Sequence, residues 1–186
     1  MLMPVANRPY LPRVTLVLGG ARSGKSRYAE QLVEGAAACG TYCATAEAGD
    51  AEMAERIRRH QARRGARWRT IEAPLELTAT LSRLAVPATA VLVDCLTLWL
   101  ANLLGAGRNA EDEIGGLLAA LSRLGGPVVF VSNEVGLGIV PEGELARRFR
   151  DHAGRLHQGV AAVAQLVAFM VAGVPLFVKT PALSRT

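Results

Sequence analysis

The sequence predicts an α/β protein of the P-loop NTPase type, a single domain in which a mostly parallel sheet carries helices on both faces. An apolar run at residues 14–18 leads directly into the pattern G-x-x-x-x-G-K-S at residues 19–26, as a buried strand feeds a phosphate-binding loop. Further along, short apolar runs alternate with amphipathic stretches, the order of a parallel sheet with crossover helices. The length of 186 residues and the hydrophobic content of 51% suit one such core.

We expect the domain to occupy residues 14–180, between a flexible N-terminal extension at 1–13 and a short C-terminal tail at 181–186. The extension contains three prolines and lacks the apolar core of a signal peptide. Residues 159–178 are almost free of polar side chains, but Gln165 and the segment AGVP interrupt them. We therefore interpret this stretch as the end of a helix and two short buried strands, with no membrane span.

The glycine-rich loop predicts a site for a nucleoside triphosphate. Its glycines allow successive backbone N–H groups to converge on phosphate oxygens at the start of a helix, where the helix dipole also favours anions. Lys25 supplies a positive charge in a solvent-facing loop, and Ser26 supplies a hydroxyl to Mg²⁺. The loop residues expected to contact nucleotide are Gly19, Gly20, Ala21, Arg22, Ser23, Gly24, Lys25 and Ser26. The motif leaves the reaction open, because kinases, motors, switches and transferases all use it.

The remaining elements follow from the hydrophobic pattern. In order, they are a strand at 41–47, a charged helix from about Asp50, a short segment at 67–73, an amphipathic helix at 75–85, a buried strand at 90–94, an apolar segment at 96–104, a helix at about 111–124 and a buried strand at 127–133. A long helix from about Glu142 completes the series. Its inward face is expected to carry Leu145, Phe149, Leu156, Val160 and Val163.

Asp94 ends the buried strand at 90–94, at the edge of the sheet where ligands of parallel sheets bind. We expect it to act with Ser26 as a ligand of the Mg²⁺ that bridges the nucleotide phosphates. An acidic residue at a strand end is also commonly just a solvated terminus, and that alternative stays open here. The guanine-binding NKxD motif of G proteins is not met by NEVG at residues 133–136.

Charge and cysteine content narrow the choice of ligand and compartment. The chain has 21 basic and 16 acidic residues, a net charge of +5, and only Lys25 and Lys179 among the basic residues are not arginine. Arginine suits planar anions such as phosphates, but this mild excess does not imply nucleic acid. The three cysteines Cys39, Cys43 and Cys95 lack metal-binding spacing, and we expect buried thiols in a reducing cytoplasm.

The segment at 50–69 combines a histidine with a run of basic residues. Met53, Ile57 and His60 fall on one helical face, and seven arginines lie between Arg56 and Arg69 with no acidic residue among them. One interpretation is a packed histidine beside a solvated basic face. In the other, the surrounding positive charge keeps the imidazole neutral and attracts phosphate, as a nucleophile acting on phosphorus requires.

Six segments occur in order along the chain: GGARSGKS, ATAEAGDAEMAERIRRHQARR, WRTIEAP, VLVDCLTLWLANLL, VSNEVGLGIVPEGELARRFRDHAGRLHQ and VAGVPL. Together, from Val14 to about Lys179, they resemble the bifunctional adenosylcobinamide kinase / adenosylcobinamide-phosphate guanylyltransferase family of cobalamin biosynthesis. The resemblance implies that ATP or GTP phosphorylates the aminopropanol hydroxyl of adenosylcobinamide. GMP from GTP then passes through a family histidine to adenosylcobinamide phosphate, giving adenosylcobinamide-GDP.

By this resemblance, the histidine that attacks the α-phosphate of GTP corresponds to His60. The positions that the resemblance places at the nucleotide are Gln61, Ala62, Arg63, Arg64, Glu72, Asp94, Thr45 and Ala46. Members of the family assemble as trimers with active sites near subunit contacts, so a homotrimer is expected. The loop SNEVGLGIVP is expected to border the cleft, against cobinamide or a neighbouring subunit.

Two other functions stay open at the level of sequence. One is a P-loop kinase for another small alcohol, in which His60 has only a structural role. The other is a non-enzymatic nucleotide-dependent module that binds nucleic acid, which the aromatic content of 5% and the lack of a basic and aromatic stacking surface disfavour. Labelling of the protein by the α-phosphate of GTP would separate the first of these from the bifunctional enzyme.

Overall fold

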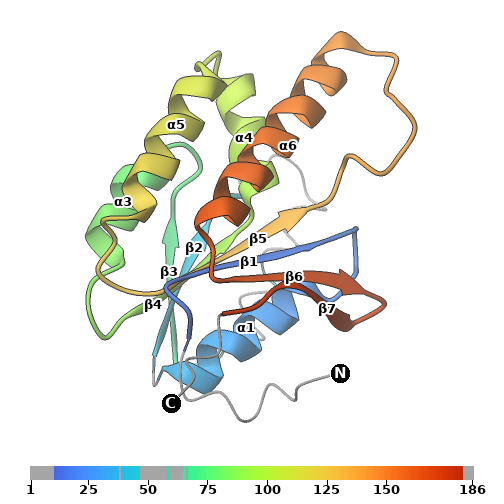
Figure 1. Ribbon diagram of the computed structural model, residues 1–186. Helices are drawn as coiled ribbons and strands as arrows, with labels where there is room; N and C mark the ends of the chain where they lie inside the picture. The colour runs from blue at the N-terminus through green and yellow to red at the C-terminus, as the bar shows by residue number, and fades with distance from the viewer. Residues whose placement is uncertain (1–10, 38, 47–57, 59–64, 66, 182–186) are drawn as a thin grey trace.

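The computed structural model describes residues 11–37, 39–46, 58, 65 and 67–181. Its elements alternate between strand and helix along much of the chain (Figure 1). In order they are β1 (Val14–Gly19), α1 (Lys25–Ala36), β2 (Gly40–Ala44), β3 (Trp68–Glu72), α3 (Leu77–Leu84), β4 (Ala90–Asp94), α4 (Leu96–Gly105), α5 (Ala110–Leu121), β5 (Val128–Asn133), α6 (Glu144–Val163), β6 (Leu166–Val171) and β7 (Val174–Lys179).

The strands form one seven-stranded sheet in the order β3-β2-β4-β5-β1-β6-β7. Every neighbouring pair is parallel except β6 and β7, which pair antiparallel. The prediction of a mostly parallel sheet is therefore confirmed. Strand β5 lies between β1 and β4, so one strand separates the glycine-rich loop from the strand that ends in Asp94.

Helices cover both faces of the sheet, as predicted (Figure 1). Helices α3, α4, α5 and α6 pack on one face, over a core that includes Trp99, Phe130 and Leu156, each 0% exposed. Helix α1 packs on the other face, where Tyr28 and Val33 contact a second apolar cluster. These two cores hold the sheet rigid and leave its carboxyl edge free to carry loops.

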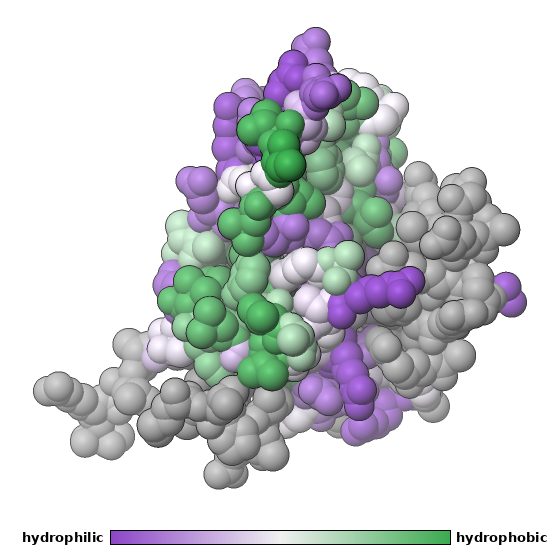
Figure 2. Space-filling view, turned by 90° about the vertical axis from the view of Figure 1, so that its right-hand side faces the viewer, coloured by the Kyte–Doolittle hydropathy of each residue, from purple (hydrophilic) through white to green (hydrophobic). Residues whose placement is uncertain are grey.

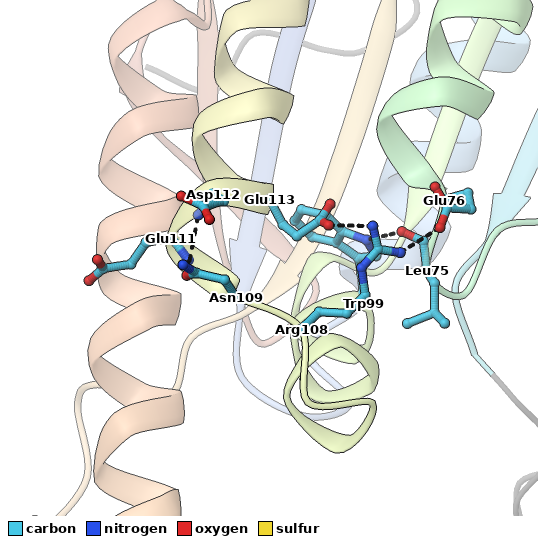
Figure 3. A network of polar contacts seen from close by, with 8 residues as sticks. All are labelled: Leu75, Glu76, Trp99, Arg108, Asn109, Glu111, Asp112 and Glu113. Carbon is cyan, nitrogen blue, oxygen red and sulfur yellow. Dashed lines mark hydrogen bonds and ion pairs between the residues drawn. The ribbon is translucent and has the colours of Figure 1, made fainter.

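A network of polar contacts ties the ends of three helices together (Figure 3). The Trp99 indole of α4 donates to the Leu75 carbonyl at 2.9 Å, just before α3 begins. Arg108, which follows α4, forms ion pairs with Glu76 and with Glu113 of α5. Asn109 caps α5, because its side-chain oxygen accepts a hydrogen bond from the Glu111 amide at 3.0 Å.

The C-terminal strand pair differs from the sequence-based expectation. Strand β6 is buried over most of its length, as predicted, but β7 lies at the edge of the sheet and exposes alternate side chains. Leu176 is 61% exposed and Val178 is 67% exposed. The prediction of two buried strands is wrong for β7, because an apolar run alone does not tell a central strand from an edge strand.

Helix α6 also turns a narrower face inward than expected. Leu156 and Val160 are fully buried, and Phe149 packs against the core from a partly buried position. Leu145 is 64% exposed and Val163 is 38% exposed, so the predicted stripe is wrong at both of its ends. The first turn of α6 lies at the end of the helix that points away from the sheet (Figure 1).

The burial of the cysteines agrees with the sequence-based expectation at two of the three positions. Cys43 and Cys95 are buried, as predicted, but Cys39 is exposed because it precedes β2 in the connection from α1. The helices of the described part of the chain are too short or too polar to cross a membrane. The charged helix predicted from about Asp50 falls mostly outside the described residues. Within this segment the structure describes Arg58, which is helical.

Candidate nucleotide site

The glycine-rich loop connects the end of β1 to the start of α1, as the motif predicts. Gly19 has no room for a side chain, because a Cβ there would lie 2.6 Å from Ser23 Oγ and 2.9 Å from the Met170 carbonyl. Gly24 caps α1 with a φ of 91°, a conformation that glycine adopts without strain. The loop therefore places backbone N–H groups at a helix N-terminus, the arrangement that binds phosphate.

Lys25 is the first residue of α1 and turns back over the loop. Its Nζ donates to the Gly20 carbonyl at 2.9 Å. The lysine itself is 7% exposed, while most of the loop residues before it are exposed, as expected of a solvent-facing loop. Its ammonium group is nevertheless in the loop, where a phosphate would replace a carbonyl as the acceptor.

The turn between β6 and β7 supports this loop from beside it. Gly173 donates its backbone N–H to the Ser23 carbonyl at 3.0 Å, and a Cβ on Gly24 would lie 3.3 Å from Gly173 Cα. Ala172 and Gly173 have φ values of 51° and 84°, as a tight two-residue hairpin turn requires. Sequence reasoning did not find this support, because nothing in the local pattern links residues so far apart along the chain.

Asp94 lies at the carboxyl end of β4, on the same edge of the sheet as the glycine-rich loop. In register it faces Ala44 of β2 and Val131 of β5, while Gly19 of β1 faces Asn133 of β5. The Tyr42 hydroxyl donates to Asp94 Oδ2 at 3.1 Å. Asp94 is thus a half-buried, hydrogen-bonded carboxylate, one strand removed from the loop.

The two other predicted positions next to β2 differ in exposure. Thr45 is 0% exposed, and its Oγ1 both donates to the Cys95 carbonyl and accepts from the Cys95 amide, each at 2.7 Å. Ala46, the next residue, is half-buried. Glu72 ends the edge strand β3 with an exposed side chain and pairs in register with Ala44.

The segment after β5 begins against the glycine-rich loop. The Glu134 amide donates to the Gly19 carbonyl at 3.0 Å, and the Asn133 side chain donates to Thr97 Oγ1 at 3.0 Å. The Glu134 carboxylate accepts from the Gly136 amide and so shapes the turn that follows. The predicted position of this segment beside the site agrees with these contacts.

Burial determines the protonation of the thiols in this region. Burial raises the pKa of Cys43 to about 12. For Cys95, burial raises the pKa and the neighbouring Asp94 charge raises it further. Burial thus favours the protonated form of both thiols.

Five predicted residues lie outside the part of the chain that the structure describes. They are the candidate nucleophile His60 and its neighbours Gln61, Ala62, Arg63 and Arg64.

The residues proposed for Mg²⁺ fit a cation that shares its ligands with a nucleotide. Ser26 follows Lys25 in the first turn of α1, and Asp94 supplies a carboxylate from β4. No group of three or more His, Cys, Asp or Glu side chains in the described ranges could hold a metal on its own. Mg²⁺ typically takes one or two protein oxygens together with phosphate oxygens and water, so this small donor set suits it.

Comparisons with known proteins show which family this chain resembles. The family model described as cobinamide kinase / cobinamide phosphate guanyltransferase matches residues 15–178. The chain is 52% identical over 166 residues to the bifunctional adenosylcobalamin biosynthesis protein CobP of Pseudomonas aeruginosa, covering 88% of this chain and 96% of the relative. It is 45% identical over 179 residues to the corresponding CobU protein of Salmonella typhimurium, covering 88% and 98% respectively.

Solved structures show the same fold at low sequence identity. The ATPase EscN of the enteropathogenic E. coli type III secretion system has a TM-score of 0.55 and 10% identity, covering 87% of this chain and 43% of that protein. Another type III secretion ATPase has a TM-score of 0.53 and 13% identity, covering 86% of this chain and 51% of that one. These likenesses show the fold alone, a mostly parallel sheet of the P-loop NTPase type.

Proposed function

Because the chain belongs to the cobinamide kinase / cobinamide phosphate guanyltransferase family, we propose that it performs two successive steps of cobalamin biosynthesis. It first phosphorylates adenosylcobinamide with ATP or GTP, and then transfers GMP from GTP to adenosylcobinamide phosphate. The observation that carries this proposal is the glycine-rich loop at the carboxyl edge of the sheet, with Lys25 folded over it and Asp94 at the same edge.

In the kinase step, the aminopropanol hydroxyl of adenosylcobinamide attacks the γ-phosphorus of the nucleotide. The bond from that phosphorus to the β,γ-bridging oxygen breaks, the hydroxyl loses its proton, and the nucleoside diphosphate leaves. The backbone N–H groups of residues 20–26 and the Lys25 ammonium hold the phosphates in place and offset the negative charge that moves onto the leaving oxygen. Ser26 and Asp94 would hold Mg²⁺, which would supply further neutralisation of the phosphate charge.

In the transfer step, the His60 imidazole attacks the α-phosphorus of GTP, and pyrophosphate leaves. A phosphate oxygen of adenosylcobinamide phosphate then attacks the same phosphorus, forms the pyrophosphate bond of adenosylcobinamide-GDP and releases the imidazole. Arg63 and Arg64 offset the charge on the departing pyrophosphate. Gln61, Ala62 and Glu72 contact the nucleotide, and the chain at Thr45 and Ala46 borders it.

We further infer a homotrimer whose contacts use the apolar surface beside the glycine-rich loop. Figure 2 views the side of the molecule that carries the β6–β7 hairpin and the segment after β5, and apolar side chains gather there in two areas. Exposed apolar residues of these segments are Leu137, Ile139, Val140, Leu145, Val171, Val174, Leu176 and Val178. Exposed apolar surface of this extent is typical of a protein interface. Sedimentation of wild type and of Ile139→Asp tests this, with a trimer expected for the first and smaller species for the second.

The proposed location is the cytoplasm, where ATP and GTP are available. An assay with adenosylcobinamide, titrated separately with ATP and GTP in the presence of Mg²⁺, tests the function directly. With ATP alone the corrinoid product is adenosylcobinamide phosphate, and with GTP it is adenosylcobinamide-GDP. If both nucleotides give adenosylcobinamide phosphate and GTP gives no adenosylcobinamide-GDP, the protein is a simple kinase.

A further inference from the structure

We propose that strand β2 and the residue after it position the Asp94 carboxylate: Tyr42 of β2 acts on the side chain, and the Thr45 hydroxyl acts on the backbone that follows Asp94. This inference rests on the proposed function, because it takes Asp94 to be a ligand of the nucleotide-bound Mg²⁺. It assigns to the Thr45 hydroxyl a role different from direct contact with the nucleotide. Tyr42 and Thr45 are therefore positioning residues, which act on the reaction through Asp94.

Tyr42 is well placed to fix the orientation of the carboxylate. The residue is 6% exposed, and its ring meets the Trp68 ring edge to face, with centroids 6.4 Å apart and planes at 79°. Trp68 is itself held by a hydrogen bond from its indole to Glu34 Oε1 at 2.9 Å. A ring restrained in this way delivers its hydroxyl to one point, where it donates to Asp94 Oδ2 at 3.1 Å. This hydrogen bond restricts the rotation of the carboxylate and so fixes the direction in which its oxygens point.

Thr45 restrains the same carboxylate through the main chain. Its Oγ1 uses both its donor and its acceptor capacity on Cys95, the residue directly after Asp94, at 2.7 Å each. The Thr45 amide also donates to the Asp94 carbonyl at 3.3 Å. The Thr45 carbonyl in turn accepts from the Asn102 side chain of α4 at 2.8 Å, which anchors Thr45 to a helix. Thr45 is 0% exposed, and its hydroxyl bonds to Cys95 and not to solvent.

The neighbouring strand completes the restraint from the other side. Cys95 Sγ lies 3.2 Å from Thr97 Oγ1, and the Asn133 side chain donates to the same Thr97 hydroxyl at 3.0 Å. The backbone that carries Asp94 is therefore tied to β2 on one side and to β5 on the other. Removing the hydroxyl of Tyr42 or Thr45 would therefore loosen the position of Asp94 while leaving its carboxylate in place.

Restraint of this kind matters for Mg²⁺ because the ion requires nearly ideal octahedral geometry at short ligand distances. Groups that orient a metal ligand commonly change metal affinity by about 10–100-fold when removed. We expect a smaller effect, about 10-fold, for a single neutral hydroxyl here. The effect should appear in metal affinity, while nucleotide affinity measured without metal stays close to that of wild type.

The test uses Mn²⁺ as a spectroscopic substitute for Mg²⁺. Binding of Mn²⁺ to the full-length protein saturated with a non-hydrolysable GTP analogue is followed by electron paramagnetic resonance for wild type, Tyr42→Phe, Thr45→Val and the conservative control Thr45→Ser. Tyr42→Phe and Thr45→Val should each weaken Mn²⁺ binding about 10-fold, and Thr45→Ser should stay near wild type. In kinase assays, the two weakened variants should recover kcat when Mg²⁺ is raised.

Combination with Asp94→Asn decides whether the effect passes through Asp94. Adding Tyr42→Phe to Asp94→Asn should cause no further loss of Mn²⁺ affinity, because the group being positioned is already altered. Additive losses, or wild-type Mn²⁺ binding by a folded Tyr42→Phe variant, would overturn the positioning role alone. An Asp94→Asn variant that binds Mn²⁺ as wild type does would instead overturn the metal role of Asp94, and this inference with it. Thermal unfolding of each variant shows whether it is folded. If Thr45→Val does not fold, the test uses Tyr42→Phe, which loses only a hydroxyl and keeps the ring that packs against Trp68.

Discussion

Ser132 Oγ lies 2.7 Å from His157 Nε2 and joins strand β5 to helix α6 inside the protein. Ser132 is 0% exposed and His157 is 7% exposed. Burial lowers the pKa of His157, and the negative charge of Glu134 only partly opposes this effect. The imidazole is therefore neutral at pH 7, and charging it inside the protein costs free energy.

The first prediction is that acid destabilises the fold through His157. Its pKa is lower in the folded than in the unfolded state, so between those two values the unfolded chain binds more protons. The contribution of neutral His157 to stability is fully present above its unfolded-state pKa of about 6.5. It is lost as the pH falls through the lower pKa of the folded state. Urea unfolding should show a larger drop in stability from pH 7.5 to pH 5.5 for wild type than for His157→Gln. Gln158→Ala, an uncharged change on the same helix, is the control and should keep the wild-type drop.

The second prediction concerns the lysine of the glycine-rich loop. Lys25→Ala should lower kinase turnover by at least about 100-fold, because the variant lacks the ammonium group that offsets the negative charge of the transferred phosphoryl group. The matched control is Lys179→Ala, which removes hydrogen bonds to the Ala161 and Ala162 carbonyls at the end of α6 and should leave turnover near wild type. Near-normal kinase turnover in a folded Lys25→Ala variant would contradict the assignment of the loop.

The third prediction is that one carboxylate serves both reactions. Asp94→Asn should raise the Mg²⁺ concentration needed for half-maximal activity and lower both kinase and guanylyltransferase rates by at least about 10-fold. Both rates are measured on the same preparation, with adenosylcobinamide and with adenosylcobinamide phosphate as acceptors. Loss of one activity without the other would show that Asp94 is not a ligand common to the two steps.

Much of the fold could be predicted because its strands are central and its loop is specified by glycine. The runs that form β1, β4 and β5 are buried on both faces, so each appears in the sequence as a largely apolar segment. The carboxylate at the end of β4 and the glycine-rich loop after β1 were likewise placed on one edge by topology alone.

The parts that could not be predicted depend on contacts between distant segments. The exposure of β7 follows from its place at the edge of the sheet, which a run such as VPLFVK does not encode. The family resemblance places Thr45 near the nucleotide, but only the register of β2 beside β4 shows that its hydroxyl bonds to Cys95. The bond from Gly173 to Ser23 likewise exists only because β6 pairs with β1.

The fourth prediction follows from that hairpin turn. Ala172 has a φ of 51°, which costs a residue with a Cβ about 1 kcal/mol and which asparagine tolerates better. Ala172→Asn should therefore raise the free energy of unfolding by about 0.5–1 kcal/mol in urea titrations. The same substitution at Ala162, within α6, should give no gain, because asparagine is a poorer helix former than alanine. Equal effects at both positions would contradict the strain at the turn.

The most direct test of the two-step account is covalent labelling of His60 by GTP. With Mg²⁺ and GTP labelled at the α-phosphate, the wild-type protein should retain label in a bond that is labile in acid and stable in alkali, as expected of a phosphoramidate. GTP labelled at the γ-phosphate should leave no label. His60→Ala should lose the label and the guanylyl transfer while keeping kinase activity, because an imidazole nucleophile is needed only for the second step. Wild-type protein that takes up no α-label, or a His60→Ala variant that labels as well as wild type, would contradict the account.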